Sequence, residues 1–306
     1  MFHRLVRFVW LCAALTAISA HAQTQTTWFV NNLTNIGGYV VGKYGAPTVV
    51  STPYGNAVHF NGVNDGLVVS NNPLAGFSTN LTVELIFKHD QLTVPTAWQP
   101  RIVHVQTPSP PDHRFTLETR VLTNGSQTAY YLDTFLRYSN NASYFLTLTN
   151  ANQHPLDEWA HMAVTYDGTN FRNFVNARLE NSGLMSGLVF TTGGFTSIGM
   201  RGNLINYFQG SVLAVRFTPR VLATNEFLCV PRTRVDTFTV TNQISVADFA
   251  LTSGLPIGFT LQEAAAPAGP WTNQTAATLT TNTPGISYRF ITAATNNTRF
   301  YRVHWP

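Results

Sequence analysis

The sequence predicts an all-β protein: an antiparallel jelly-roll β-sandwich followed by a small C-terminal β-sandwich-like module. No stretch of a dozen residues keeps a helical period, whereas alternating, β-branched and aromatic runs recur between turn residues. Aromatic residues make up 12% of the chain and charged residues only 10%, so the chain can build a core. Many short strands in a span of this size indicate a sandwich or jelly roll.

The first 22 residues predict a secretory signal peptide. Arg4 and Arg7 supply a positive start, and an apolar run too short to span a bilayer follows them. Small residues end the segment at Ala22, so we expect the mature chain to begin at Gln23. No later stretch is typical of a membrane span. We therefore expect a secreted, periplasmic or cell-surface protein.

Charge and cysteine content exclude several classes of function. The formal net charge is +4, but the basic residues are scattered, so we predict no nucleic-acid partner. Once the signal is removed, Cys229 is the one remaining cysteine and no internal disulfide can form. Its neighbours in EFLCVP are apolar, which predicts an inert, part-buried thiol.

The predicted strands of the large sandwich follow one another with turn residues between them. Asp167-Gly168 is a strong hairpin signal that joins two of these strands. The strand before this turn is apolar on both faces, so we expect it to be central and His161 to be a hydrogen-bonded core residue. Residues 221–227 predict one short helical turn. In chain order the predicted strands cover residues 57–60, 66–70, 81–89, 101–106, 114–121, 129–137, 144–149, 158–166, 171–176, 195–200 and 209–218.

A second segment begins near Pro231. Strand-like runs cover residues 237–251, 258–264, 287–293 and 298–306. We therefore predict three parts: the signal peptide at 1–22, the jelly roll at 23–230 and a small β module at 231–306. The last segment is long enough for a small sandwich, although its surface-to-volume ratio makes it marginal.

Several stretches resemble laminin G-like, concanavalin A-like jelly rolls. The run EWAHMAVTYDGTNFRNFVN is similar to the family pattern Trp-x-His-Val-Ala-x-Thr-Tyr-Asp-Gly, and NAVHFNGVNDGLVV and NLTVELIFKH resemble earlier strands. FTSIGM and YFQGSVLAVRFTPRVLATNEF resemble the closing segment, so the resemblance covers about residues 28–227 in the right order. The last segment is similar to short β modules that end many secreted bacterial proteins, particularly verrucomicrobial ones.

The resemblance implies a lectin or glucanase fold, but the family's calcium-binding acids are missing. Leu213 and Ala214 stand in the closing strand where the family has acids, and Asn61 replaces the Asp of Phe-Asp-Gly. Because Ca²⁺ requires several oxygen ligands, some of them charged, we predict no metal of the family type. Ala177 replaces the Gly of the family's Asn-Gly, so we expect that turn to be built differently.

No recognised catalytic motif is present. Glycoside hydrolases of this fold carry Glu-x-Asp-x-x-Glu on one strand, and this chain has no such run. It also lacks Gly-x-Ser-x-Gly, His-Glu-x-x-His and P-loop patterns. We therefore assign no catalytic residue and no cofactor.

One predicted hairpin carries a candidate sugar-binding face. Strand alternation places charged and aromatic side chains together on it, and such side chains can stack on sugar rings and bond their hydroxyls. A two-residue turn at Asn124-Gly125 would pair Glu118 with Tyr131 and Thr116 with Asp133. Trp98, in a Pro-flanked loop, could add a binding platform or pack as a lid. The candidate residues are Arg114, Glu118, Arg120, Tyr131, Asp133, Arg137 and Trp98.

Three functions remain open from the sequence. The first is a secreted, non-catalytic protein that binds carbohydrate or a cell-surface glycan or protein. The second is a divergent glycoside hydrolase or polysaccharide lyase, and the third is a purely structural envelope protein. The same charged face is also compatible with an ordinary solvated lattice of salt bridges that binds nothing.

Overall fold

We describe the fold from a computed structural model of the 306-residue chain. The structure describes residues 24–304 apart from 53, 78, 92–98, 109–111, 122–128, 138–142, 148–151, 189, 191–192, 230–231, 254–258, 284–286 and 295–298. The predicted signal peptide and its cleavage site lie outside the described residues. Within the described ranges, no helix has the length and hydrophobicity needed to cross a membrane.

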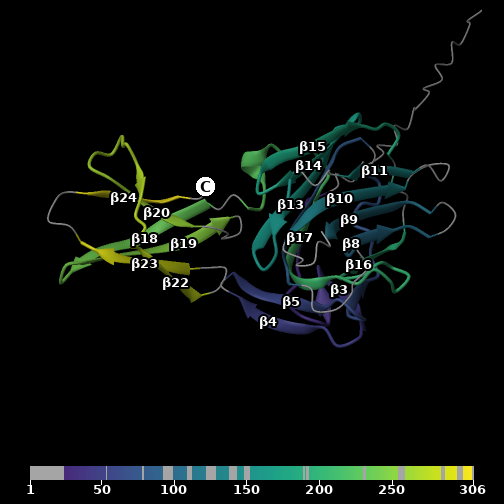
Figure 1. Cartoon of the computed structure of the whole chain (residues 1–306), viewed down its shortest axis with the longest axis horizontal. Helices are drawn as coiled ribbons and strands as arrows, with labels where there is room; N and C mark the ends of the chain where they lie inside the picture. The colour runs from purple at the N-terminus through teal and green to yellow at the C-terminus, as the bar shows by residue number, and fades with distance from the viewer. Residues whose placement is uncertain are drawn as a thin grey trace, which may run out of the picture.

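Two antiparallel sheets face each other in the large sandwich (Figure 1). The first sheet contains β1 (Thr26–Phe29), β4 (Thr48–Thr52), β5 (Gly55–Asn61), β7 (Leu81–His89), β13 (Trp159–Tyr166), β14 (Asn170–Val175), β15 (Arg178–Leu184) and β17 (Gln209–Thr218). Its order is β15-β14-β13-β7-β17-β5-β4, and β1 also pairs with β17. Strands that are far apart in sequence are therefore neighbours, as in a jelly roll.

The second sheet carries the candidate hairpin. It contains β2 (Asn35–Ile36), β3 (Tyr39–Tyr44), β6 (Gly66–Val69), β8 (Arg101–Gln106), β9 (Arg114–Val121), β10 (Ala129–Arg137), β11 (Ser143–Thr147), β12 (His154–Pro155) and β16 (Phe195–Ile198). Its order is β11-β10-β9-β8-β16-β6-β3-β2, with β12 also paired to β10. The antiparallel jelly-roll sandwich predicted from the sequence is confirmed.

Aromatic and branched side chains fill the space between the two sheets. Phe87 from the first sheet and Phe115 from the second are both buried in one cluster, together with Trp28 and Phe217. Trp28 meets the Phe217 ring edge-on, with centroids 5.2 Å apart. This continuous core gives β8, β9 and β10 a rigid support, so their outward side chains are held in place.

The hairpin between β13 and β14 confirms the predicted turn and the predicted central strand. Gly168 has a φ of 93°, which glycine adopts without strain, and Asp167 Oδ1 accepts the backbone N–H of Asn170 at 2.7 Å. β13 is buried on both faces between β14 and β7. The predicted helical turn is also present, as the 3₁₀ turn η2 (Thr224–Glu226).

The turn at Asn176-Ala177 differs from our expectation. Both residues have positive φ, 46° and 63°, so Ala177 keeps the left-handed backbone that suits glycine. Asn176 Oδ1 also accepts the His161 backbone N–H at 2.9 Å. The expectation of a different turn was therefore wrong, because the Asn176 side chain ties this backbone to β13.

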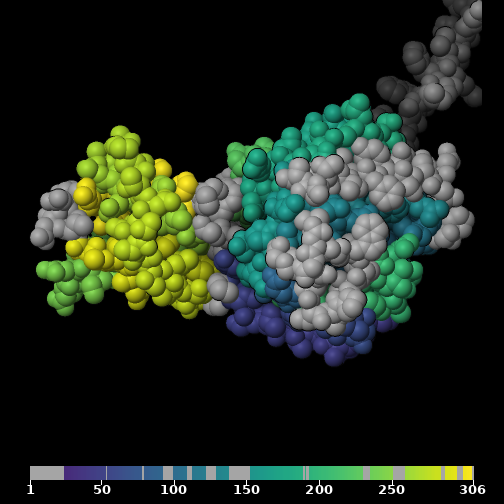
Figure 2. All heavy atoms as spheres, viewed as in Figure 1, coloured from purple at the N-terminus to yellow at the C-terminus, as the bar shows by residue number. Residues whose placement is uncertain are grey.

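The strands after residue 231 form two further sheets. One contains β18 (Arg232–Thr241), β19 (Ile244–Ser253), β22 (Thr278–Thr283) and β23 (Ser287–Ala293), and the other β20 (Thr260–Ala264), β21 (Thr272–Asn273) and β24 (Phe300–His304). Phe249, Tyr288 and Phe290 form their shared core. In the described part of the chain these strands pair only with one another, and they appear as a lobe of their own (Figure 2). The predicted boundary at Pro231 stays a prediction.

Candidate functional site

A pocket of about 300 Å³ lies on the outer face of the second sheet, over β8, β9 and β10. The core-facing side chains of these strands are apolar, such as Val103, Phe115 and Leu132. Alternation therefore sends the polar side chains outward. The pocket is lined by Gln99, Arg101, His104, Arg114, Thr116, Arg120, Phe135 and Arg201.

The register of β9 and β10 differs from the predicted one by two residues. Glu118 lies opposite Asp133, and Tyr131 lies opposite Arg120. The predicted turn, Asn124-Gly125, lies outside the described residues. Because an even shift keeps the alternation of both strands in phase, Arg114, Glu118, Arg120 and Asp133 stay on one face while their pairs change.

A β-bulge in β8 adds one side chain, Arg101, that alternation hides. Arg101 lies opposite Glu118 and Val103 opposite Leu117, so Ile102 is the extra residue. Arg101 and His104 are three positions apart and would point to opposite faces of a regular strand. The bulge brings both to the pocket.

Two buried carboxylates lie under the arginines. Arg101 Nη1 is 2.6 Å from Glu118 Oε2, and Arg120 Nε donates to Asp133 Oδ2 at 2.5 Å. Both carboxylates have an exposed fraction of 0%. The face is therefore not the solvated lattice that the sequence also allowed, and burial makes its charge balance energetically important.

Burial shifts the pKa of Glu118 strongly upward, to about 9. Loss of water is the main cause, because it penalises the charged carboxylate. Arg101 pulls the pKa down, whereas the charge of Asp133 and its hydrogen bond push it further up. A pKa of about 9 favours the protonated form of Glu118 at neutral pH.

His104 is a neutral hydrogen-bond donor in this pocket. Burial, followed by the charge of Arg201, lowers its pKa to about 3. Its Nδ1 accepts the backbone N–H of Gly202 at 3.3 Å, which assigns the proton of the neutral ring to Nε2. Nε2 is buried and finds no hydrogen-bond partner among the described residues.

A third carboxylate stands at the edge of the site. Asp112 accepts hydrogen bonds from Arg114 Nε at 2.8 Å and from Arg137 Nη1 at 3.1 Å. Burial would raise the pKa of Asp112, but the hydrogen bond and charge of Arg114 outweigh it, and the net effect is a lowered pKa. Asp112 therefore stays ionised and holds both guanidinium groups.

The structure brings some of the predicted residues to the pocket and separates others from it. Arg114 and Arg120 line it, whereas Glu118 and Asp133 lie beneath its lining. Tyr131 packs against the core, and Trp98 lies outside the described residues. Sequence reasoning missed Gln99, Arg101, His104 and Arg201. The alternation of polar residues in RIVHVQ could have pointed to His104.

The outer face of the first sheet carries a second buried ionic cluster. Glu84 lies under Arg216, which hydrogen-bonds to it, and 3.1 Å from His161 Nε2. The Leu228 backbone N–H donates to Glu84 Oε1 at 2.6 Å. His161 is thus a core residue with a hydrogen-bond partner, as predicted. Cys229 is buried nearby, and burial followed by the charge of Glu84 raises the pKa of its thiol to about 12, while its inertness stays a prediction.

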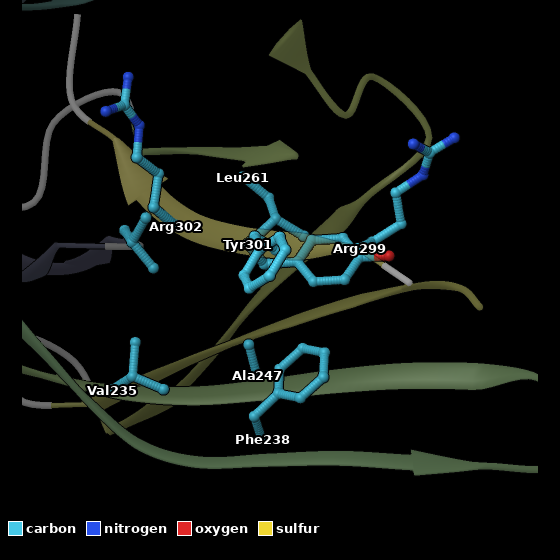
Figure 3. Close-up of a pocket in the computed structure, with 9 residues that line it drawn as sticks. Val235, Phe238, Ala247, Leu261, Arg299, Tyr301 and Arg302 are labelled. Atoms are coloured by element: carbon cyan, nitrogen blue, oxygen red, sulfur yellow. The ribbon is translucent and has the colours of Figure 1, made fainter. Parts of the chain in front are cut away.

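A separate apolar pocket of about 300 Å³ lies between the two C-terminal sheets. Phe238 from β18 and Tyr301 from β24 face each other across it, with ring centroids 5.3 Å apart (Figure 3). Arg299 and Arg302 extend away from the gap between these two rings (Figure 3). The space is thus a gap at the rim of this lobe's own apolar core, and no polar group converges on it.

Metal ligands do not gather in the part of the chain that the structure describes. No group of three or more His, Cys, Asp or Glu side chains there could hold an ion. At the place of the family's calcium-binding acids, Leu213 and Ala214 are buried apolar residues. Asp65, near Asn61, uses its two oxygens to accept backbone N–H groups of Ala46 and Asn61.

Comparisons with known proteins agree with this architecture. The chain matches the family of the concanavalin A-like lectin/glucanases superfamily over residues 61–226, just over half of its length. No relative is found among curated proteins.

Similar solved structures include domain 4 of AbnA, a GH43 extracellular arabinanase from Geobacillus stearothermophilus, in complex with arabinotriose. Its identity is 18% and its TM-score 0.48, over 66% of this chain and 96% of that one. The binding domain of botulinum neurotoxin DC in complex with SialylT has 9% identity and a TM-score of 0.49, over 90% and 86%. A heptameric SAP-like pentraxin from Limulus polyphemus has 14% identity and a TM-score of 0.39, over 76% and 94%. From its family match and its two-sheet antiparallel core, this chain belongs to the concanavalin A-like lectin/glucanases superfamily.

Proposed function

We propose that this protein is a secreted, non-catalytic carbohydrate-binding protein whose site is the pocket over β8, β9 and β10. The observation that supports it is the lining of that pocket. The ring of Phe135 stands beside Arg114, Arg120 and Gln99 on a rigid sheet. Aromatic rings pack against the C–H face of sugars, and guanidinium and amide groups bond hydroxyls.

The position of the carboxylates favours binding over catalysis. Glycoside hydrolysis needs two carboxyl groups that both reach the substrate, one of them to donate a proton. Glu118 and Asp133 are fully buried and do not line the pocket. Each is also held under an arginine, by Arg101 and Arg120 respectively.

One observation supports the second candidate, a divergent glycoside hydrolase or polysaccharide lyase. The raised pKa of Glu118 beside Asp133 is typical of a carboxyl group that can act as a general acid. Such an enzyme would require the arginines above Glu118 to move when substrate binds.

A broad polysaccharide array, with product analysis of each well, separates these functions. Saturable binding without product release is the result we expect. Arg120→Ala should weaken this binding, because it removes a lining group together with the guanidinium that pairs with Asp133. Product release that Glu118→Gln abolishes would instead establish an enzyme. If the protein binds no glycan, the structural envelope role is the one of the three functions that remains.

A further inference from the structure

The charges around the pocket do not balance. Among the residues that the structure describes, five arginines surround it or its edge and three carboxylates pair with them, so the arginines exceed the carboxylates by two. Arg101 pairs with Glu118 and Arg120 with Asp133, while Arg114 and Arg137 share Asp112. The fifth arginine is Arg201.

Arg201 has no ion pair or side-chain hydrogen bond with any residue that the structure describes. It follows β16 in a tight turn, where its backbone N–H donates to the Ile205 carbonyl, and its side chain lines the pocket. Burial first, and then the charge of Arg114, lowers its pKa. A partly desolvated cation beside a second cation is unfavourable in the absence of an anion.

His104 provides a second, independent observation. Its side chain lines the pocket and is only 1% exposed, and its Nε2–H is a buried donor without a partner in the ranges that the structure describes. Buried donors in native proteins normally have an acceptor. An anion in the pocket would supply acceptor oxygens to this donor and to the guanidinium groups at once.

We propose that the pocket binds the anionic group of an acidic saccharide, a carboxylate or a sulfate ester, through Arg114, Arg201 and the Nε2–H of His104. This inference rests on the proposed carbohydrate-binding function and names its ligand class. Planar guanidinium groups match the two oxygens of such anions, and Phe135 offers the adjacent sugar ring an apolar wall.

Titration calorimetry with two matched pairs of oligosaccharides tests the ligand class. One pair is trigalacturonate and its carboxyl-reduced neutral trimer. The other is a sulfated galactan tetrasaccharide and its desulfated counterpart. We expect at least one acidic member to bind about tenfold or more tightly than its neutral partner, because an ionised hydrogen bond is stronger than a neutral one. Which pair responds distinguishes carboxylate from sulfate.

Two arginine variants locate the anion. Arg201→Gln should lower the affinity for the acidic sugar about tenfold, through loss of one charge-assisted bond, and should change the affinity for its neutral partner much less. Arg178→Gln is the matched control, because Arg178 is exposed on β15 of the other sheet. Arg201 holds no other side chain in place, so the melting temperature of Arg201→Gln should match that of the wild type.

The possible failures are distinct. Equal affinity for acidic and neutral members, or acidic binding that Arg201→Gln does not change, would overturn the anion site but leave carbohydrate binding intact. If none of the four probes binds while other glycans of the array do, the anion site is overturned and carbohydrate binding is kept. If the protein binds no glycan on the whole array, the proposed carbohydrate-binding function itself is overturned.

Discussion

The outer faces of the two sheets bury a carboxylate under arginine in two different ways. On the first sheet, Glu84 contacts His161, Arg216 and the Leu228 N–H. A cap of apolar side chains including Leu222, Phe227 and Cys229 then closes this face. On the second sheet, Glu118 contacts Arg101 and Asp133, and an open pocket lies above them.

The pKa values of the two carboxyl groups move in opposite directions for this reason. Burial alone would raise the pKa of Glu84, but the hydrogen bonds and charges of His161 and Arg216 outweigh it and lower that pKa. At Glu118 burial prevails and the pKa rises to about 9. A fully compensated buried charge belongs to the scaffold, whereas an incompletely compensated cluster beside a pocket is typical of a binding site.

Replacing the buried glutamate by glutamine should therefore lower the free energy of unfolding by different amounts on the two faces. Glu84→Gln removes an ionised group from beside Arg216, and we expect it to lower the free energy of unfolding at pH 7 by about 3 kcal/mol. Glu118→Gln replaces a carboxyl group that already carries a proton, so we expect a loss of under about 1 kcal/mol. Urea denaturation of both variants measures the difference, and equal losses would contradict the opposite ionisation states.

A rise in pH from 6 to 8 should weaken the open face. The pKa of Glu118 is raised on folding, so its contribution is complete below the unfolded value near 4.5 and disappears as pH rises through about 9. Arg101, Arg120, Asp133 and Arg201 are the charges that face it. Between pH 6 and pH 8 the wild type should lose roughly 3 kcal/mol of stability through this group.

Glu118→Gln supplies the control for this pH dependence. A neutral amide cannot titrate, so the variant should keep a flatter stability curve over the same interval. Urea unfolding midpoints, measured for both proteins at half-unit pH steps, give the two stability curves to compare. Identical curves for wild type and variant would mean that Glu118 is ionised throughout.

Acid should destabilise the protein through buried neutral histidines. The pKa values of His104 and His89 fall to about 3 and about 4, mainly because of burial. Their contribution is complete above the unfolded value near 6.5 and is lost as pH falls toward the folded values. His104→Gln should lower the slope of stability against pH between 6 and 4 by the equivalent of about one proton, roughly 1.4 kcal/mol per pH unit. An unchanged slope would show that His104 does not titrate on unfolding.

The long strands could be predicted from sequence because their faces are strongly defined. β7, β8, β9, β10 and β17 begin and end at the predicted residues, since alternating apolar runs bounded by turns determine them. β3 and β4 were missed because they are largely exposed and present little apolar periodicity. Residues 237–251 were predicted as one strand-like run. They form β18 and β19, with positive φ at Asn242 and Gln243 between them.

The site could be predicted only in part. Alternation placed Arg114 and Arg120 correctly, because the register error was even and left each on its own face. The bulge at Ile102 reverses the alternation in β8, so Arg101 could not be found by counting. Arg201 reaches the pocket from a turn after β16, a proximity that depends on tertiary packing. The burial of Glu118 was also unexpected, since carboxylates usually remain solvated.

Thiol reactivity gives the smallest effect and compares the two faces directly. Cys229 lies under the closed face, and its pKa near 12 lowers the thiolate fraction at pH 8 by roughly a thousandfold. In a chain that starts at Gln23, Ellman's reagent should leave Cys229 unmodified until urea unfolds the protein. Phe135→Cys, made together with Cys229→Ala, places the thiol in the pocket lining, where it should react in the native state. Rapid reaction of Cys229 in the native protein, or no reaction of a cysteine at position 135, would mean that the reagent reaches the two faces equally. The distinction between scaffold and site would then rest on charge alone.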